Sequence, residues 1–198
     1  LLIQPQSEWG KHPYLPNGLL ALASILMSVG IKVKIIDMNI DASLPSIKKL
    51  NHYEWIGIGI LGAPYIPSAI RLAKEIRSMG YENKVYIGGP VVDKINNNDW
   101  QKLFISNQLT NIEVVQNQAD LKIMLGEINL PDMYNCSMAK AIQNLSEKMK
   151  RIYFSKEFCI FTSDGCMFNC SFCAANKGQS EQFRNLTIFR NEVITITK

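Results

Sequence analysis

The stretch WIGIGILGAPYIPSAIRLAKEIRSMGYENKVYIGGP, residues 55–90, decides the fold. It opens with an apolar, isoleucine-rich run at residues 55–60, which is typical of a buried β-strand. Apolar residues then recur at helical spacing from Ile66 to Met79, and a second apolar run follows at residues 85–87. Two strands separated by a helix of this length predict a parallel pair, because a parallel pair needs a long crossover connection.

The same alternation continues on both sides of this stretch. Gly30 and Gly80 stand just past two predicted helices, where a residue in the left-handed conformation commonly ends a helix. Residues 1–126 therefore predict an α/β fold, a Rossmann-like doubly wound parallel sheet with helices on both faces. The further predicted elements are strands at residues 1–4, 33–36 and 112–115, and helices at 19–29 and 120–125.

The second part of the chain changes character after Gly126. Polar and turn residues, GEINLPDMYNCS, precede one predicted helix over residues 138–149, so that 127–158 is interpreted as a linker with a helix. Residues 158–162 predict a strand, and residues 188–196 fit a strand or a helix equally well. Elsewhere in the chain, Asn96-Asn97-Asn98 is interpreted as a loop.

Composition excludes several classes of protein. Of the 198 residues, 47% are hydrophobic and 19% are charged, which is ordinary for a globular chain. The net charge of +4 is spread along the chain, so no nucleic-acid footprint is expected. No apolar run reaches the roughly 18 residues that span a bilayer, and no basic leader opens the chain. We expect a cytoplasmic protein, because three of the five cysteines lie within eight residues, a pattern of metal ligation in a reducing compartment.

These three cysteines, Cys166, Cys170 and Cys173, lie in the segment SDGCMFNCSFCAANKG. Thiolates suit iron–sulfur clusters and zinc. Three ligands leave one iron of a [4Fe–4S] cluster open to a substrate, as an open position distinguishes catalytic from structural zinc sites. A zinc site needs a fourth ligand, for which Cys159 and Cys136 are the candidates, although both also fit a role as small core residues. Chance clustering of buried cysteines is the remaining alternative.

The Cys-x3-Cys-x2-Cys spacing, with Phe172 before the last cysteine, resembles the signature of the radical S-adenosylmethionine superfamily. The resemblance implies that Cys166, Cys170 and Cys173 bind three irons and that the fourth iron chelates S-adenosylmethionine, with Phe172 packed beside the cluster. Reduction then splits that cofactor into methionine and a 5′-deoxyadenosyl radical. The longer string FTSDGCMFNCSFCAAN, residues 161–176, is similar to the version in cobalamin-dependent members, except that Asp164 commonly is Arg and Met167 commonly is Pro.

The front part contains glycine turns after its predicted strands, at the edge of a parallel sheet where ligands bind. A G-x-G-x-x-G fingerprint does not occur, which argues against NAD. The pattern is similar to the cobalamin-binding domain that precedes many radical S-adenosylmethionine barrels, and it implies base-off cobalamin. One departure is Gln116-Asn117-Gln118-Ala119-Asp120, where relatives have a Gly-Glu-Gly-Glu-like turn. The residues of the expected cofactor site are Pro16, Gly18, Leu19, Asp37, Gly59, Gly62, Gly88, Gly89 and Pro90.

The resemblance implies three parts: a cobalamin-binding domain at 1–126, the linker at 127–158, and the first β/α unit of a radical S-adenosylmethionine barrel at 159–198. We expect a fragment, inactive in isolation, because a full barrel takes on the order of 200 residues. The implied enzyme methylates or rearranges a small molecule or a peptide, with flavodoxin or ferredoxin as electron donor. Arg184 is expected to support the cluster loop or to form an exposed salt bridge.

Two other functions compete with this interpretation. One is a non-catalytic module that binds cobalamin or another small ligand and carries a structural metal knuckle. The other is methylthiolation of tRNA, in which a front domain holds three further cysteines. The first 135 residues contain no cysteine, which argues against methylthiolation.

Overall fold

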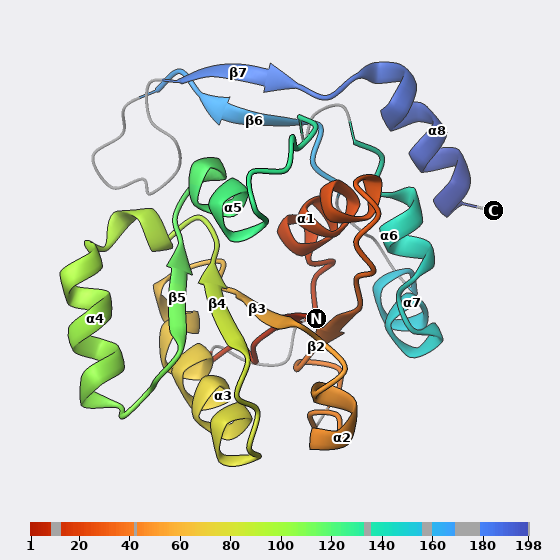
Figure 1. Cartoon of the computed structure of the whole chain (residues 1–198). Helices are drawn as coiled ribbons and strands as arrows, with labels where there is room; N and C mark the ends of the chain where they lie inside the picture. The colour runs from red at the N-terminus through yellow and green to blue at the C-terminus, as the bar shows by residue number, and fades with distance from the viewer. Residues whose placement is uncertain (9–12, 42, 133–135, 156–159, 169–178, 198) are drawn as a thin grey trace. The chain divides into compact units, whose positions relative to one another are not determined.

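Five strands form one parallel sheet in the computed structural model (Figure 1). The structure describes residues 1–8, 13–41, 43–132, 136–155, 160–168 and 179–197. The strand order is β2-β1-β3-β4-β5 and every pair is parallel, which confirms the predicted α/β, doubly wound fold. The strands are β1 (Leu2–Gln4), β2 (Ile35–Asp37), β3 (Trp55–Gly59), β4 (Lys84–Gly88) and β5 (Ile112–Val115).

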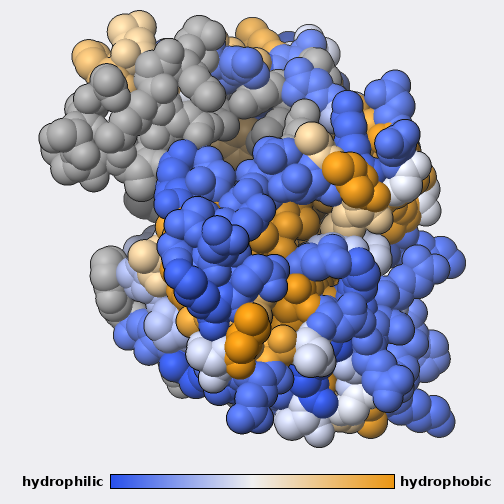
Figure 2. Space-filling view, turned by 60° about the vertical axis from the view of Figure 1, so that its left-hand side comes forward, coloured by the Kyte–Doolittle hydropathy of each residue, from blue (hydrophilic) through white to orange (hydrophobic). Residues whose placement is uncertain are grey.

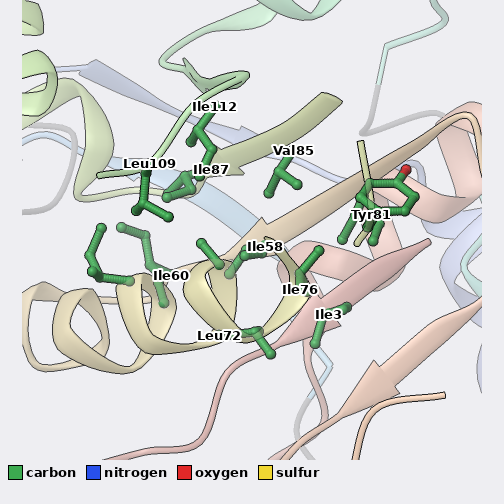
Figure 3. Close-up of a cluster of buried hydrophobic side chains, with 14 of the residues drawn as sticks. Ile3, Ile58, Ile60, Leu72, Ile76, Tyr81, Val85, Ile87, Leu109 and Ile112 are labelled. Carbon is green, nitrogen blue, oxygen red and sulfur yellow. The ribbon is translucent and has the colours of Figure 1, made fainter. Parts of the chain in front are cut away.

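Three helices pack on one face of this sheet and form the main hydrophobic core with it. Figure 3 shows part of this core. They are α2 (Ile47–Leu50), α3 (Ile66–Ser78) and α4 (Asn97–Ser106). Alternate strand residues such as Ile3, Ile58 and Ile87 point to this face, since successive side chains of a strand point to opposite faces. Each fully buried leucine or isoleucine contributes about 1.5–3 kcal/mol relative to an exposed one. The core therefore holds the carboxyl ends of the strands in a fixed register.

Short elements complete the front of the chain. The 3₁₀ turns η1 (Ala63–Tyr65) and η2 (Val92–Lys94) follow β3 and β4, and α5 (Gln118–Met124) follows β5. Gly30 and Gly80 have φ values of 87° and 91°, which confirms the left-handed helix ends.

Contacts between residues divide the chain into two units. The first is Leu1–Pro13 with Ile35–Ile128, and it contains the parallel sheet. The second is Tyr14–Lys34 with Asn129–Lys198, so the helix between β1 and β2 belongs with the second part of the chain. The division predicted from the sequence, at residues 126 and 158, stays a prediction.

The second unit combines helices with a two-stranded antiparallel hairpin. Within it, α1 contacts α6, and α6 contacts α8. Its elements are α1 (Asn17–Ser28), α6 (Ala139–Gln143), α7 (Glu147–Tyr153), β6 (Ser163–Cys166), β7 (Gln179–Phe183) and α8 (Leu186–Ile196).

Two predicted elements are wrong in extent. The single helix at 138–149 is two helices, because Ser146 has extended backbone and its hydroxyl accepts a bond from Met149 N, 3.2 Å away, to cap α7. The strand expected at 158–162 begins only at Ser163; residues 160–162 are not in a strand, and 158–159 lie outside the described residues.

Two other segments are helical. Residues 96–98 are not a loop: Asn96 caps α4, its side chain accepting from Asp99 N at 2.9 Å, and Asn97 begins the helix. Residues 188–196, which the sequence left open, belong to α8, where Asn185 is the capping residue.

Hydrophilic residues predominate on the face drawn in Figure 2, with hydrophobic residues interspersed among them. Among the described helices, none has the length and apolar character needed to cross a bilayer.

Candidate functional site

The first cysteine of the triplet lies at the end of strand β6. Strand β6 pairs with β7 in antiparallel register, Ser163 opposite Phe183 and Cys166 opposite Gln179. The register shifts between Asp164 and Cys166, where Gly165 has φ 93°, a conformation that residues other than glycine adopt only at a cost. Cys166 is a half-buried free thiol. The hairpin thus carries Cys166 to its end, where the rest of the triplet follows.

The other two cysteines, Cys170 and Cys173, lie outside the described residues, as does Phe172. Consequently, the structure does not test the proposed cluster ligands as a set. Among the residues that it describes, no three histidine, cysteine or acidic side chains lie close enough together to hold a metal ion. Met167 and Phe168, which follow Cys166, are exposed.

Cys136, one of the two alternative zinc ligands, is a buried free thiol of the second unit. Burial raises the pKa of this thiol, and a hydrogen bond with Ser28 opposes the rise only in part. A groove of about 540 Å³ adjoins it, lined by α1 and the linker, with Lys140 as its charged side chain. Its burial fits the role of a small core residue. The other candidate, Cys159, lies outside the described residues.

The expected cofactor residues of the first unit lie at the carboxyl edge of the parallel sheet. Asp37 ends β2, is fully buried, and accepts two bonds from Asn39, from its backbone N at 2.8 Å and its Nδ2 at 2.7 Å. The side chain of Asn39 in turn accepts from Ser7 N at 2.8 Å. Asp37 therefore holds together the loops after β1 and β2.

The glycines at this edge differ in the space around them. A Cβ added at Gly89 would lie 2.1 Å from Ile60 O, and Gly89 has φ 131°. At Gly88 and Gly62 an added Cβ would make ordinary contacts, 3.5 Å from Val115 O and 3.6 Å from Pro64 Cδ. Gly59 ends β3, and Pro90 follows β4. Gly89 is thus required by the fold itself, whereas Gly62 and Gly88 could each hold a Cβ at ordinary contact distance.

The turn after β5 is closed by its own side chains. Asn117 caps α5 by accepting from Asp120 N at 3.0 Å, and Asp120 accepts from Gln116 N at 2.7 Å. The Gln116 amide donates to Val92 O and Ile95 O, 3.3 and 3.1 Å away. These bonds join residues 116–120 to one another and to the loop after β4.

The remaining cofactor positions open helix α1 in the second unit. Pro16 is the N-cap residue, and its carbonyl accepts from Leu20 N at 2.9 Å. Leu19 is buried, and a Cβ added at Gly18 would have no atom within 4 Å. Gly18 therefore has no packing reason to lack a side chain among the residues that the structure describes.

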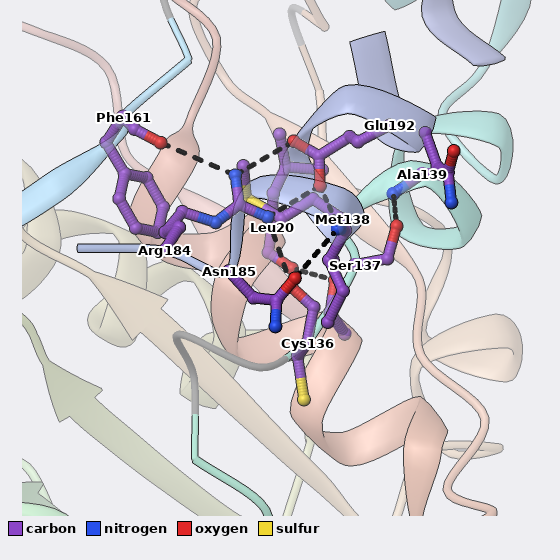
Figure 4. A network of polar contacts seen from close by, with 12 residues as sticks. Leu20, Cys136, Ser137, Met138, Ala139, Phe161, Arg184, Asn185 and Glu192 are labelled. Atoms are coloured by element: carbon purple, nitrogen blue, oxygen red, sulfur yellow. Dashed lines mark hydrogen bonds and ion pairs between the residues drawn. The ribbon is translucent and has the colours of Figure 1, made fainter. Parts of the chain in front are cut away.

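A buried ion pair of the second unit was predicted only in part from the sequence, which indicated Arg184 but not its partner. Arg184 forms not an exposed salt bridge but a buried one, with Glu192 of α8 (Figure 4). Sequence inspection missed Glu192, because a carboxylate in an apolar helix gives no signal of burial. The signal available in the sequence was that Glu192 follows the basic residue Arg184 by eight positions.

Comparison with solved structures finds a similar fold. The structure of the radical S-adenosylmethionine methyltransferase TsrM from Kitasatospora setae, with tryptophan substrate and a S-adenosylmethionine analogue bound, matches with a TM-score of 0.62 at 15% identity. This chain is similar to TsrM in fold. The match covers 97% of this chain and 44% of TsrM, so the chain spans less than half the length of that methyltransferase. No protein-family model matches the sequence, and no curated protein matches it.

Proposed function

We propose that this chain carries the cluster-binding hairpin and the cobalamin-binding type of front domain of a radical S-adenosylmethionine enzyme of the methyltransferase class. One observation carries the proposal: a Cys-x3-Cys-x2-Cys triplet begins at the end of β6, in a chain whose fold is similar over 97% of its length to TsrM. The cysteine spacing supplies the chemistry and the likeness of fold supplies the context. The proposed reaction is methylation or rearrangement of the substrate.

In this proposal Cys166, Cys170 and Cys173 ligate a [4Fe–4S] cluster. The donor set fits, because three thiolates are the ligands that iron–sulfur clusters prefer, and Cys166 is a free, half-buried thiol. When bound, the cluster supplies an open iron and one electron to S-adenosylmethionine. The contribution of the chain is to hold three thiolates in one short loop and to leave the fourth iron without a protein ligand.

Cobalamin is proposed for the carboxyl edge of the parallel sheet, where doubly wound folds bind ligands. Gly62 and Gly88 are proposed to line this site, because they lie at or just past the carboxyl ends of β3 and β4 and have no side chain. In the second unit, Gly18 is the residue with open space, since a Cβ added there would have no atom within 4 Å. Asp37 and Gly89 contribute through the loops that they hold in place.

Anaerobic reconstitution with iron and sulfide tests the proposal. We expect about four irons per chain, and an electron paramagnetic resonance signal of the reduced protein that changes on addition of S-adenosylmethionine. Cys166→Ala should lose most of this iron. Cys136→Ala is the matched control and should retain all of it, because Cys136 is buried against Ser28 outside the triplet.

Stoichiometric zinc without iron uptake would refute the enzyme and support the alternative, a binding module with a structural metal knuckle. Loss of iron in Cys136→Ala would instead identify Cys136 as a fourth protein ligand. A cluster with four protein ligands has no open iron for S-adenosylmethionine. The first result would make the triplet part of a structural zinc site, and the second would make it part of a cluster with four protein ligands.

A further inference from the structure

The ion pair of Arg184 and Glu192 is buried and bidentate. Their side chains are 1% and 0% exposed. Nη2 of Arg184 donates to Oε2 of Glu192 at 2.7 Å, and Nη1 donates to Oε1 at 3.0 Å. Two parallel bonds between a guanidinium and a carboxylate fix the angle between the two side chains as well as their distance.

The pair also holds two further segments of the second unit (Figure 4). Arg184 donates to the carbonyls of Cys136 at 3.1 Å and Phe161 at 3.4 Å, and Glu192 accepts from Met138 N at 2.7 Å. The guanidinium lies 5.0 Å from the ring centre of Phe161 and 5.7 Å from that of Phe189. The ion pair therefore joins four segments: the linker, the residues before β6, the residues after β7, and α8.

This point is the base of the cysteine hairpin. The backbone N of Arg184 donates to Thr162 O at 2.9 Å, directly beside the pairing of Ser163 with Phe183. Cys166 lies at the opposite end of β6. It is four residues from Thr162, which is roughly 13 Å at the rise of an extended strand. The direction of the hairpin from its base sets where Cys166 and the following loop lie.

Stability alone is a poor reason for such a pair. A buried ion pair loses much of its attraction to desolvation, and apolar residues of similar volume often replace one without loss of stability. An apolar pair would fill the space, but it would not fix an angle or bind two carbonyls and an amide. The geometry is better explained by a need for one defined orientation.

We propose that Arg184 and Glu192 form a positioning clamp, which fixes the direction of the β6–β7 hairpin so that Cys166, Cys170 and Cys173 reach one cluster. This inference rests on the proposed function for the cluster itself. Neither residue touches the cluster in this account; both act through the backbone of the hairpin.

The decisive variant is the double substitution Arg184→Met with Glu192→Leu in the full chain. It removes both charges together and fills the space, so that no unpaired charge is buried. Arg184→Lys and Glu192→Gln are the conservative single variants. Glu147→Gln is the matched control: it breaks the Glu147–Lys150 pair of α7, in which the Glu147 side chain is 84% exposed.

We expect the double variant to keep the circular dichroism spectrum of the wild type while its reconstituted iron falls at least threefold. Its melting temperature should fall, because the Cys136 and Phe161 carbonyls and the Met138 amide lose their partners. Its residual resonance signal should broaden, because the thiolates sample several arrangements. Hydrogen exchange at the Arg184 and Met138 amides should accelerate tenfold or more, whereas Glu147→Gln should match the wild type. Arg184→Lys should recover part of the iron, since one donor to Glu192 remains.

A folded double variant with full iron, an unchanged signal and unchanged exchange would overturn the clamp. If the double variant does not fold, the two conservative variants decide by the same three readouts. If the wild type takes up no iron, the proposed function fails, but hairpin exchange still tests the clamp: unchanged protection in the variants refutes it, and lost protection supports it.

Discussion

Gly89 connects β4 to the following turn in a conformation and a space that only glycine fits. We predict that Gly89→Ala destabilises the protein by roughly 3 kcal/mol or more, because it adds backbone strain to a contact that would lie 2.1 Å from Ile60 O. Urea unfolding measures the change. Gly88→Ala is the control and should change stability by less than about 1 kcal/mol, since its Cβ would make ordinary contacts. Equal losses in the two variants would refute the assignment.

Gly18 poses the opposite case, a glycine that the fold does not need. We predict that Gly18→Ala stabilises α1 by about 0.5–1 kcal/mol, because alanine has the higher helix propensity and its Cβ would meet no atom within 4 Å. The same variant should bind hydroxocobalamin several-fold more weakly than the wild type in an absorbance titration. A variant that is more stable and binds equally well would remove Gly18 from the cobalamin site.

Cys136 and Cys166 should differ in their reaction with iodoacetamide. Burial disfavours the thiolate and raises the pKa of Cys136 above the ordinary thiol value of 9.0, so its alkylation should stay slow at pH 8 and rise only at higher pH. Cys166 is half-buried and should react first in the cluster-free protein. Mass spectrometry of timed samples gives both rates. Unfolding in urea should abolish the delay at Cys136, and equal rates in the folded chain would contradict the prediction.

Helix α3 is tied to the amino edge of the sheet by Arg77, in its last turn. The guanidinium donates to Thr110 O at 3.0 Å, Asn83 O at 2.8 Å and Asn111 O at 2.7 Å, and also to Tyr81 O. These bonds join the loop after α3 to the loop before β5.

We predict that Arg77→Met costs about 1–3 kcal/mol, because it leaves these carbonyls without their donor. Arg71→Met, six residues earlier in α3, is the control. The Arg71 side chain is 64% exposed in its pair with Glu8, so its loss should cost at most about 1 kcal/mol. Denaturant midpoints of both variants test the contrast, and a larger loss for Arg71→Met would refute it.

Sequence patterns predicted the five strands and the helices α1, α3 and α5 to within two residues, and missed α2, α4 and the division between α6 and α7. β5 has the predicted bounds, and the other four strands and α3 lie within two residues of theirs, because buried strands read as unbroken apolar runs. The errors occur where a single polar side chain decides. Asn96 and Ser146 cap helices through hydrogen bonds that composition does not reveal, and the hairpin begins after its apolar run. The pairing of Arg184 with Glu192 depends on burial, which one sequence does not show.

In the whole molecule, the order of the elements along the chain does not predict which unit each belongs to. Helix α1 lies between β1 and β2 in the sequence, yet it belongs with α6 in the second unit. Local patterns cannot predict this assignment, since the contact joins residues more than a hundred positions apart. The metal-ligating role of the cysteine triplet, by contrast, stays a prediction from the sequence, where three cysteines lie within eight residues.

This assignment makes a prediction for native-state hydrogen exchange. We expect the protected amides of α1 to open with those of α6 as one cooperative unit, at a free energy different from that of β1 and β2. Helix α3, which belongs to the unit of the sheet, is the internal control and should open with the strands. Exchange of α1 in step with β1 would contradict the division.

The strand order has a consequence for how the chain folds during synthesis. Strand β1 is an interior strand of the sheet, where Leu2 pairs with Ile35 on one side and Gly57 on the other. At ribosomal rates of roughly 5–20 residues per second, Gly57 is made on the order of seconds after Leu2. Throughout this interval the apolar β1 has its backbone groups unpaired on at least one side. The nascent chain is therefore a candidate for chaperone protection before its sheet can close.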